Sequence, residues 1–320
     1  MKLGSVSRRL LVLIVAVFSA GLPCKAADQT PVTFARAEGQ LLIRVGRQPL
    51  ATYVYADREI TRPYFAHVHA PGRVQVTRNH PPDKTTDSID HATFHPGIWM
   101  AFGDLSGSDN WRNLARVVHE QFLEGPAGGP DKGSFAVRNR YLADDGRTTV
   151  CREECRYAIH VRPSGYLLIW DATFSNPEGS FYFGDQEEMG LGFRVASPIR
   201  VEAGGTIRDA QGRTNEKQVW GNTADWCDYS GTIRGTHLGV TLMCHPANFR
   251  PSWFHARDYG LLEANPFGRK AFGKGEASKV VVASGEKLRL RYGVLLHAGP
   301  QNSPPDLKAA FADYLQLTAK

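Results

Sequence analysis

Short runs of alternating or β-branched residues, separated by Gly, Pro, Asn and Asp, recur along most of the chain and restrict its fold more than any other feature. Clear examples span residues 41–45, 165–174, 239–243, 279–283 and 288–296. Period-two alternation sends successive side chains to opposite faces, so these runs predict strands joined by turns. Helical periodicity is confined to a short piece at 111–122 and a better one at 305–317. The pattern therefore predicts a mostly β protein, a large antiparallel β-sandwich with few short helices.

The first 26 residues have the pattern of a secretory signal peptide. Basic residues precede an apolar run at 10–22, and small residues flank a cut after Ala26. That run is shorter than the roughly 20 residues of a spanning helix, and no later run is longer or more apolar. We expect a mature chain of residues 27–320 that is periplasmic or extracellular and not membrane-spanning. The alternative is a lipoprotein acylated at Cys24, although Pro23 stands where a small residue is expected.

Charge and length limit the partners and the number of domains. The chain has 38 Lys and Arg against 32 Asp and Glu, but four of the basic residues lie in the first 26, which contain no acid. The 34 that remain make the mature chain nearly neutral, without a block of Lys or Arg. Nucleic-acid binding needs clustered cations, so we exclude it. The mature length, roughly 294 residues, fits a single large sandwich domain.

The mature chain has four cysteines: Cys151, Cys155, Cys227 and Cys244. An even number in an oxidising compartment allows three pairings. If Cys151 and Cys155 share a strand, four residues at about 3.3 Å each place them roughly 13 Å apart, too far for a disulfide. A pair drawn from Cys227, Cys244 and one of the earlier two remains open, and so do free buried thiols.

Four long connections interrupt the strand rhythm and contain most of the unusual residues. They span 78–113, 184–192, 215–230 and 245–269. Long connections in a compact domain are usually functional or disordered. These are rich in Trp, His and Phe, unlike disordered segments, so we expect them to be ordered and to form a site.

Histidines and carboxylates in these connections are the candidate catalytic residues. A neutral imidazole carries protons or binds metal, and a neighbouring carboxylate such as Asp90 fixes its tautomer. Two carboxylates in different environments can serve as general acid and base. The candidates are His91, His95, Asp185, Glu187, Glu188, His245 and His255. Alternatively, a histidine packs a loop and the acids at 185–188 form a solvated edge strand.

Aromatic, amide and charged residues of the same connections are candidates for ligand binding. Aromatic rings stack on the apolar faces of sugars, while acids and amides take the hydroxyl groups. The candidates are Arg78, Trp99, Trp220, Trp226, Asn248, Arg250, Trp253, Arg257 and Asp258. The alternatives are core packing for the aromatic residues, and a structural network in which Arg257 and Asp258 pair with a neighbouring acid.

Several of these motifs together resemble the PmoA family of exported bacterial proteins. They lie at residues 62–65, 76–78, 90–99, 103–104, 111, 245–250, 257–260 and 265–268. The histidine-rich element of that family reads like Asp-His-Pro-His-His-Arg-Gly, whereas residues 90–97 read Asp-His-Ala-Thr-Phe-His-Pro-Gly. The resemblance implies a β-sandwich similar to galactose mutarotases and related sugar-acting enzymes. A membrane oxygenase, which the family label suggests, would need several apolar spans that the mature chain lacks.

The leading expectation is a secreted enzyme that acts on a carbohydrate or another small polar substrate. Its chemistry would be that of a hydrolase, lyase or epimerase, with histidines and carboxylates exchanging protons. No cofactor is expected, although a divalent metal at the histidine cluster is an option. The alternatives are a carbohydrate-binding protein without catalysis and an oxygenase with a metal held by histidines and a carboxylate.

Overall fold

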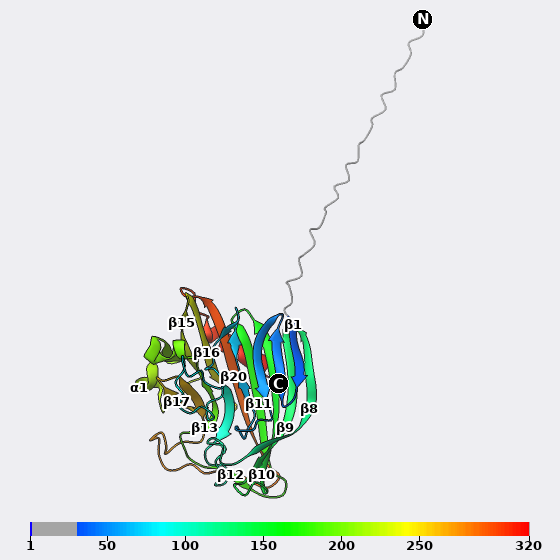
Figure 1. Cartoon of the computed structure of the whole chain (residues 1–320), viewed down its shortest axis with the longest axis vertical. Helices are drawn as coiled ribbons and strands as arrows, with labels where there is room; N and C mark the ends of the chain where they lie inside the picture. Colours follow the sequence, from blue (N-terminus) through cyan, green and yellow to red (C-terminus); the bar gives the residue numbers. More distant parts are fainter. Residues whose placement is uncertain (2–30, 320) are drawn as a thin grey trace.

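A computed structural model describes Met1 and residues 31–319, and about half of this part of the chain is β-structure (Figure 1). The expected signal peptide and Cys24 lie outside the described residues. Within them, no helix has the length and apolar character needed to cross a membrane.

Sixteen antiparallel strands form one continuous sheet that is folded into two layers. The first layer is, in spatial order, β14 (Thr206–Asp209), β15 (Trp226–Ile233), β16 (Thr236–Cys244), β20 (Lys287–Pro300), β11 (Gly165–Ser175), β10 (Thr149–Arg162), β9 (Lys132–Leu142) and β8 (Val117–Pro130). The second is β1 (Pro31–Ala37), β2 (Gln40–Val45), β3 (Gln48–Val54), β4 (Tyr64–Ala66), β7 (Ile98–Phe102), β13 (Met189–Arg194), β18 (Leu261–Asn265) and β17 (Trp253–Arg257). The layers join where β1 pairs with β8.

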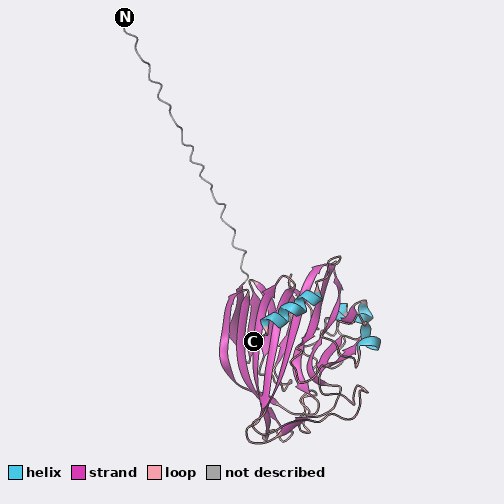
Figure 2. Cartoon of the chain, turned by 180° about the vertical axis from the view of Figure 1, so that it is seen from behind, coloured by secondary structure: helices cyan, strands magenta, loops and turns pink. Residues whose placement is uncertain are grey.

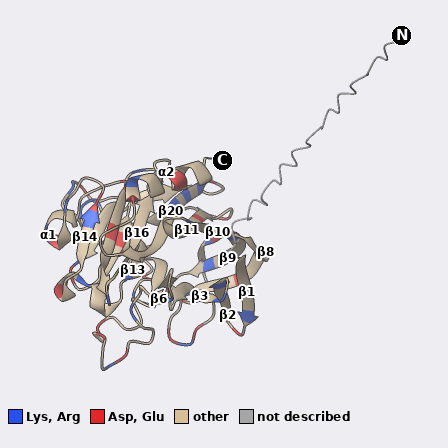
Figure 3. Ribbon diagram, turned by 90° about the horizontal axis from the view of Figure 1, so that it is seen from above, with Lys and Arg blue, Asp and Glu red and all other residues tan. Residues whose placement is uncertain are grey.

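Smaller elements complete the fold. They are the strand pairs β5 (His69–Ala70) with β6 (Val74–Gln75) and β12 (Phe181–Phe183) with β19 (Val280–Val282), the helices α1 (Asn215–Val219) and α2 (Leu307–Leu317), and 3-10 turns at Ser197–Ile199 and Val201–Ala203. Figure 3 shows basic and acidic residues in both layers.

The core lies between the two layers because each strand turns its apolar side chains inward. Phe65 on β4 of the second layer lies 5.1 Å from the ring of Tyr157 on β10 and 5.6 Å from that of Trp170 on β11, both in the first layer. All three side chains are buried. These contacts across the layers confirm the predicted antiparallel sandwich.

Helix α2 lies across the outer face of the first layer (Figure 2). Asp306 caps its first turn, since the carboxylate accepts a hydrogen bond from the Ala309 amide at 3.0 Å. Tyr314 packs against Gly293 of β20, where an added Cβ would lie 2.9 Å from the tyrosine ring. The helix expected at 305–317 is therefore confirmed.

Some expected elements differ from the structure. The helix expected at 111–122 is wrong: the chain makes turns there and enters β8 at Val117. The long connections are also shorter than expected, because they contain β7, β13, α1, β15, β17 and β18. Every residue of β7 and β13 is buried, so neither strand shows the alternation by which half-buried strands are recognised.

All four cysteines of the described region, Cys151, Cys155, Cys227 and Cys244, are free and buried. Cys151 and Cys155 both lie on β10, as the argument against their pairing requires. The alternative of free thiols therefore holds, and a bond that includes Cys227 or Cys244 is absent from residues 31–319.

Candidate functional site

A row of side chains crosses five strands on the outer face of the second layer. The strand register places Tyr64 opposite Trp99, Trp99 opposite Gly192, Gly192 opposite Glu263, and Glu263 opposite His255. In the next row, Arg194 and Arg257 both lie opposite Leu261. Two strand spacings therefore separate the backbones of these arginines, about 10 Å.

Arg194 binds Asp90, which reaches the sheet from the connection before β7. Two guanidinium nitrogens donate to the Asp90 carboxylate at 2.9 and 3.0 Å, and His91 Nδ1 lies 2.8 Å from the same group. Burial alone would raise the pKa of Asp90, but hydrogen bonds from Arg194, Ser88 and His91 outweigh it and hold the pKa well below its usual range. Asp90 is therefore an ionised anchor for the His91 imidazole.

Four aromatic rings form a column above this part of the sheet. His95 stacks on Trp99 at 5.0 Å, His91 on His95 at 4.8 Å, and Tyr259 lies 6.2 Å from His91. Burial, followed by the charge of Arg194, holds the pKa of His95 well below its usual range, so this imidazole is neutral. His91 is the exposed histidine of the pair, with 45% of its side chain accessible.

Arg78 holds the connection that carries these histidines. Its guanidinium is buried and donates to the carbonyl groups of Ser88, Asp90, His91 and His95 at 2.7–3.3 Å. These four bonds use the donors that a ligand would need. Arg78 therefore positions the connection, and the prediction that it binds substrate directly is wrong.

A second group of charged residues surrounds His255 and Arg257 on β17. Arg257 binds the carboxylates of Glu187 and Glu216 at 2.8 Å each and donates from Nε to His255 Nε2 at 3.0 Å. Burial raises the pKa of Glu187, although the charge of Arg257 opposes the shift. Burial and then Arg257 lower the pKa of His255 to about 3. Glu187 thus retains its proton more readily than an exposed glutamate, while His255 is neutral.

Glu263 lies fully buried beneath this group. Its Oε2 is 3.3 Å from His255 Nδ1, and burial, reinforced by the charge of Glu188, raises its pKa well above the usual range. Trp111 covers the centre of the row, because a Cβ added at Gly192 would meet its ring at 3.4 Å. This centre is therefore packed, and open access is limited to the outer side chains, among them His91 and Glu187.

The tryptophan and arginine candidates at the edge of this face are partly exposed. Trp220 lies 5.8 Å from the Arg257 guanidinium, and Trp253 lies 6.0 Å from that of Arg250. Glu188 pairs with Arg112 at 2.8 Å. These residues lie around the group centred on Arg257.

Asp258 and Arg257 both bind Glu216, as the structural-network alternative requires. The Asp258 carboxylate accepts from the Glu216 amide at 2.8 Å, and the Glu216 carboxylate accepts from the Asp258 amide at 3.0 Å. Asp258 therefore links α1 to the end of β17, and its carboxylate accepts a hydrogen bond from the backbone of α1.

Other candidates lie apart from this face, so the expectation that all of them share one site is wrong. Asp185 accepts from the backbone amides of residues 270, 271 and 278 and anchors that loop. His245 lies 5.8 Å from Tyr314 of α2, and Trp226 packs beside the same helix. Asn248 bonds to the backbone of Arg291, whereas Arg250, which donates to Ser278, stays at the edge of the face beside Trp253. These residues are close in sequence to those of the face, but strands that are neighbours in sequence, such as β16 and β17, belong to different layers.

Sequence reasoning missed Arg194, Glu216, Tyr259 and Glu263. Arg194 and Glu263 are the charged residues of two strands that are mostly apolar. A buried charge needs a partner, so a single charge within an apolar strand was the signal that could have marked both. For Glu216 and Tyr259, the sequence contained no comparable signal.

The histidine cluster does not fit a divalent metal. The rings of His91 and His95 are stacked at 21°. A guanidinium nitrogen of Arg194 lies 3.2 Å from His95 Nδ1, at the position that a metal ion bound to this nitrogen would occupy. Across residues 31–319, no group of three or more His, Cys, Asp and Glu side chains is arranged to hold a metal ion.

A family model matches most of the chain. A family of unknown function, DUF6807, matches residues 40–312. The chain belongs to this family. The match does not bear on the resemblance to the PmoA family, which stays a prediction. Among curated proteins, none matches this DUF6807 chain.

Several solved structures similar to this chain are described as galactose mutarotase-like. A galactose mutarotase-like protein from Clostridium acetobutylicum is 7% identical, with 86% of the DUF6807 chain and 100% of that protein covered and a TM-score of 0.40. One from Lactobacillus casei is 9% identical, with 83% and 100% covered and a TM-score of 0.35. A galactose mutarotase related enzyme from Lactobacillus acidophilus is 11% identical, with 86% and 98% covered and a TM-score of 0.29. These likenesses concern the fold alone.

Proposed function

We propose that this chain is an exported carbohydrate-active enzyme whose site is the outer face of the second layer. In this proposal Glu187 donates a proton to the substrate, and His91, oriented by Asp90, accepts one. The observation that carries the proposal is that the pKa values of two carboxyl groups on one face are shifted in opposite directions. The pKa of Asp90 is held low and that of Glu187 is raised.

His91 has the geometry of a general base. Its Nδ1 is bonded to the ionised Asp90, an arrangement that fixes the tautomer and leaves Nε2 as the acceptor. The side chain is nearly half exposed, so a substrate hydroxyl can reach it. His95 cannot take this role, because it is buried beneath His91 and next to Arg194.

The spacing of the two carboxyl groups follows from the arginines that bind them. Arg194 and Arg257, which bind them, stand about 10 Å apart on the sheet, and Tyr259 lies 4.3 Å from the Arg194 guanidinium. Tyr259 and Trp220 offer aromatic faces for a sugar ring, and the charged groups around them can bind its hydroxyls. This combination supports a carbohydrate as the substrate class.

The test is a screen of the purified mature protein against glycans and glycosides, with product analysis, followed by two variants. We expect Glu187→Gln and His91→Ala each to lower kcat/KM by about 10²–10⁴-fold, the usual contribution of a general acid or base. The matched control is Glu154→Gln, which changes an exposed glutamate paired with Arg138 on the first layer. Full turnover in Glu187→Gln would contradict the proposal.

A second candidate function is carbohydrate binding without catalysis. The ion pairs of Arg257 with Glu187 and Glu216 favour this alternative. They hold the three side chains in place, and the pairing with Arg257 opposes protonation of the Glu187 carboxylate. In that case no glycoside in the screen would be turned over, and Tyr259→Ala would abolish binding. Turnover that is lost in His91→Ala while binding remains would exclude this alternative.

A further inference from the structure

A buried His–Asp pair lies on the outer face of the first layer, opposite to the proposed site. His297 on β20 and Asp228 on β15 face each other across β16, with Nε2 2.9 Å from Oδ1. The exposed fractions of the two residues are 1% and 5%. Thr241 of the intervening strand also donates to Asp228, at 2.8 Å. Neither the core nor the proposed reaction uses these groups.

Gly239 leaves the room that the His297 ring needs to reach Asp228. It lies opposite His297 in the register of β16 and β20, and a Cβ at this position would lie 2.8 Å from His297 Nε2 and 2.5 Å from the Ser230 Cβ. The imidazole can therefore lie flat across β16 only because residue 239 has no side chain. Three neighbouring strands thus combine to hold one histidine ring in a fixed orientation.

The pair leaves one nitrogen of His297 available as an acceptor. Burial would raise the pKa of Asp228, but His297, Ser230 and Thr241 outweigh it and lower the pKa, so the carboxylate is ionised. In the neutral imidazole, Nε2–H donates to the carboxylate, and Nδ1 then carries the lone pair. That buried nitrogen has no hydrogen-bond partner among residues 31–319. A buried acceptor without a donor is costly, so a donor from outside would stabilise it.

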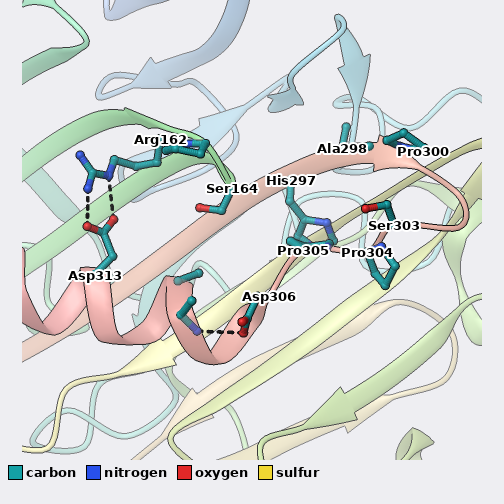
Figure 4. Close-up of a pocket in the computed structure, with 14 residues that line it drawn as sticks. Arg162, Ser164, His297, Ala298, Pro300, Ser303, Pro304, Pro305, Asp306 and Asp313 are labelled. Atoms are coloured by element: carbon teal, nitrogen blue, oxygen red, sulfur yellow. Dashed lines mark hydrogen bonds and ion pairs between the residues drawn. The ribbon is translucent and has the colours of Figure 1, made fainter.

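His297 lines a pocket of about 610 Å³ between the β10–β11 turn, the end of β20 and the start of α2 (Figure 4). This volume is within the usual range for small-molecule sites. Its apolar lining comes from four proline rings and from alanines, and hydroxyls of Ser164 and Ser303 stand on either side of the imidazole. Arg162 is engaged by Asp313, and one oxygen of Asp306 caps α2. The polar groups still open to a ligand are therefore mainly hydrogen-bond acceptors and hydroxyls.

We propose that this pocket binds a neutral, hydroxyl-rich ring of the size of one hexose, with one hydroxyl donating to His297 Nδ1. The proline rings contact the C–H face of the sugar, and the open carboxylate oxygen of Asp306 accepts a second hydroxyl. The pocket is a binding subsite on the first layer. It does not rest on the proposed function, because it shares no residue with the face that carries Glu187.

The test is saturation-transfer NMR on the purified mature protein with D-glucose, D-galactose and D-mannose, and with phenol as the arm for an apolar hydroxyl. We expect at least one hexose to bind and to shift the Nδ1 resonance of His297 in nitrogen-15-labelled protein. Ala309→Trp fills the pocket from the exposed side of α2 and should weaken binding at least tenfold. Ala312→Trp, on the same helix and also exposed but outside the pocket, is the matched control and should bind like the original chain.

Three results would overturn the proposal: no hexose binds, only phenol binds, or Ala309→Trp binds as well as Ala312→Trp. Loss of hexose binding in Glu187→Gln would also overturn it, because the sugar would then occupy the second layer. If Glu187→Gln abolishes turnover of a glycoside while hexose binding here persists, both proposals stand. If no glycoside is turned over and Ala309→Trp still abolishes hexose binding, the subsite stands without the enzyme.

Discussion

Arginines position most of the polar side chains on the outer face of the second layer. Arg78 and Arg194 each have only 1% of the side chain exposed, yet they have different partners. Arg78 donates to backbone carbonyls and fixes the path of the chain, whereas Arg194 binds a carboxylate with two parallel bonds. Only the planar guanidinium provides donors in this fork, so lysine cannot replace either residue without loss.

For Arg194→Lys we expect the pKa of Asp90 to rise, because one ammonium cannot reproduce the two bonds to its carboxylate. The measurement is the titration of Asp90 by NMR of carbon-13-labelled aspartate. Arg200→Lys is the control, since Arg200 pairs with the exposed Glu202. An unchanged titration of Asp90 in Arg194→Lys would show that the other hydrogen bonds to the carboxylate determine its pKa.

Gly239→Ala should destabilise the fold by about 1–3 kcal/mol, the usual cost of overpacking. The new methyl would lie within 3 Å of the Tyr229 carbonyl, the Ser230 side chain and the His297 ring. Gly125→Ala is the control, because its methyl on β8 would find no atom closer than 3.9 Å. Urea unfolding measures both. Equal midpoints would mean that the first layer yields enough to accommodate a side chain between β15 and β20.

Among the elements, α2 depends on a few specific contacts. It is the one helix of more than two turns in the part of the chain that the structure describes, and it rests on the sheet through Tyr314. An isolated helix of 11 residues is marginal in water, so packing and capping must stabilise it.

Asp306→Ala should lower the free energy of unfolding by about 1 kcal/mol, because it removes the acceptor for the Ala309 amide. Asp306→Asn retains an oxygen that can accept this bond and should stay within a few tenths of a kcal/mol of the original chain. Thermal unfolding followed by circular dichroism compares the two. If both variants unfold at the same temperature, the cap does not contribute and packing alone holds the helix.

The strands of the first layer could be predicted from sequence better than those that carry the candidate site. Strands β11, β16 and β20 show alternation or β-branched runs that local periodicity detects. Strands β7 and β13 are buried on both faces, and their runs of apolar residues show no alternation. The spacing of apolar residues at 111–122 predicts a helix, but from Val117 onward the chain pairs with β9 as part of β8.

The same limit applies to the candidate residues. Sequence reasoning selected His91, Glu187 and His255 as candidates because they stand among other polar residues in connections, and the structure places all three on one face. It also placed His245 there, yet β16 and β17 continue into different layers. Which layer a strand joins depends on long-range pairing, which local composition does not encode.

On the scale of the whole molecule, the core between the layers contains a carboxyl group, that of Glu153, whose protonation is coupled to folding. Glu153 points inward from β10 and is 2% exposed. Asn139 donates to its Oε2 at 2.8 Å, and its Oε1 has no partner among residues 31–319. Burial raises its pKa to about 7. The stability of the entire sandwich is thereby linked to pH.

The sign of this linkage follows from the protons bound in each state. Between pH 4.5 and 7 the folded chain keeps a proton on Glu153 that the unfolded chain has released, so stability is full below pH 4.5 and falls as pH rises to about 7. A shift of this size corresponds to about 3 kcal/mol. Glu153→Gln should therefore match the original chain near pH 4.5 and exceed its stability at pH 8, as measured by urea unfolding across this range. Histidines such as His255 titrate in both proteins and cancel in the difference. Glu154→Gln, the outward neighbour, should show no such gain, and a pH-independent difference for Glu153→Gln would mean that the carboxyl group is ionised in the core throughout.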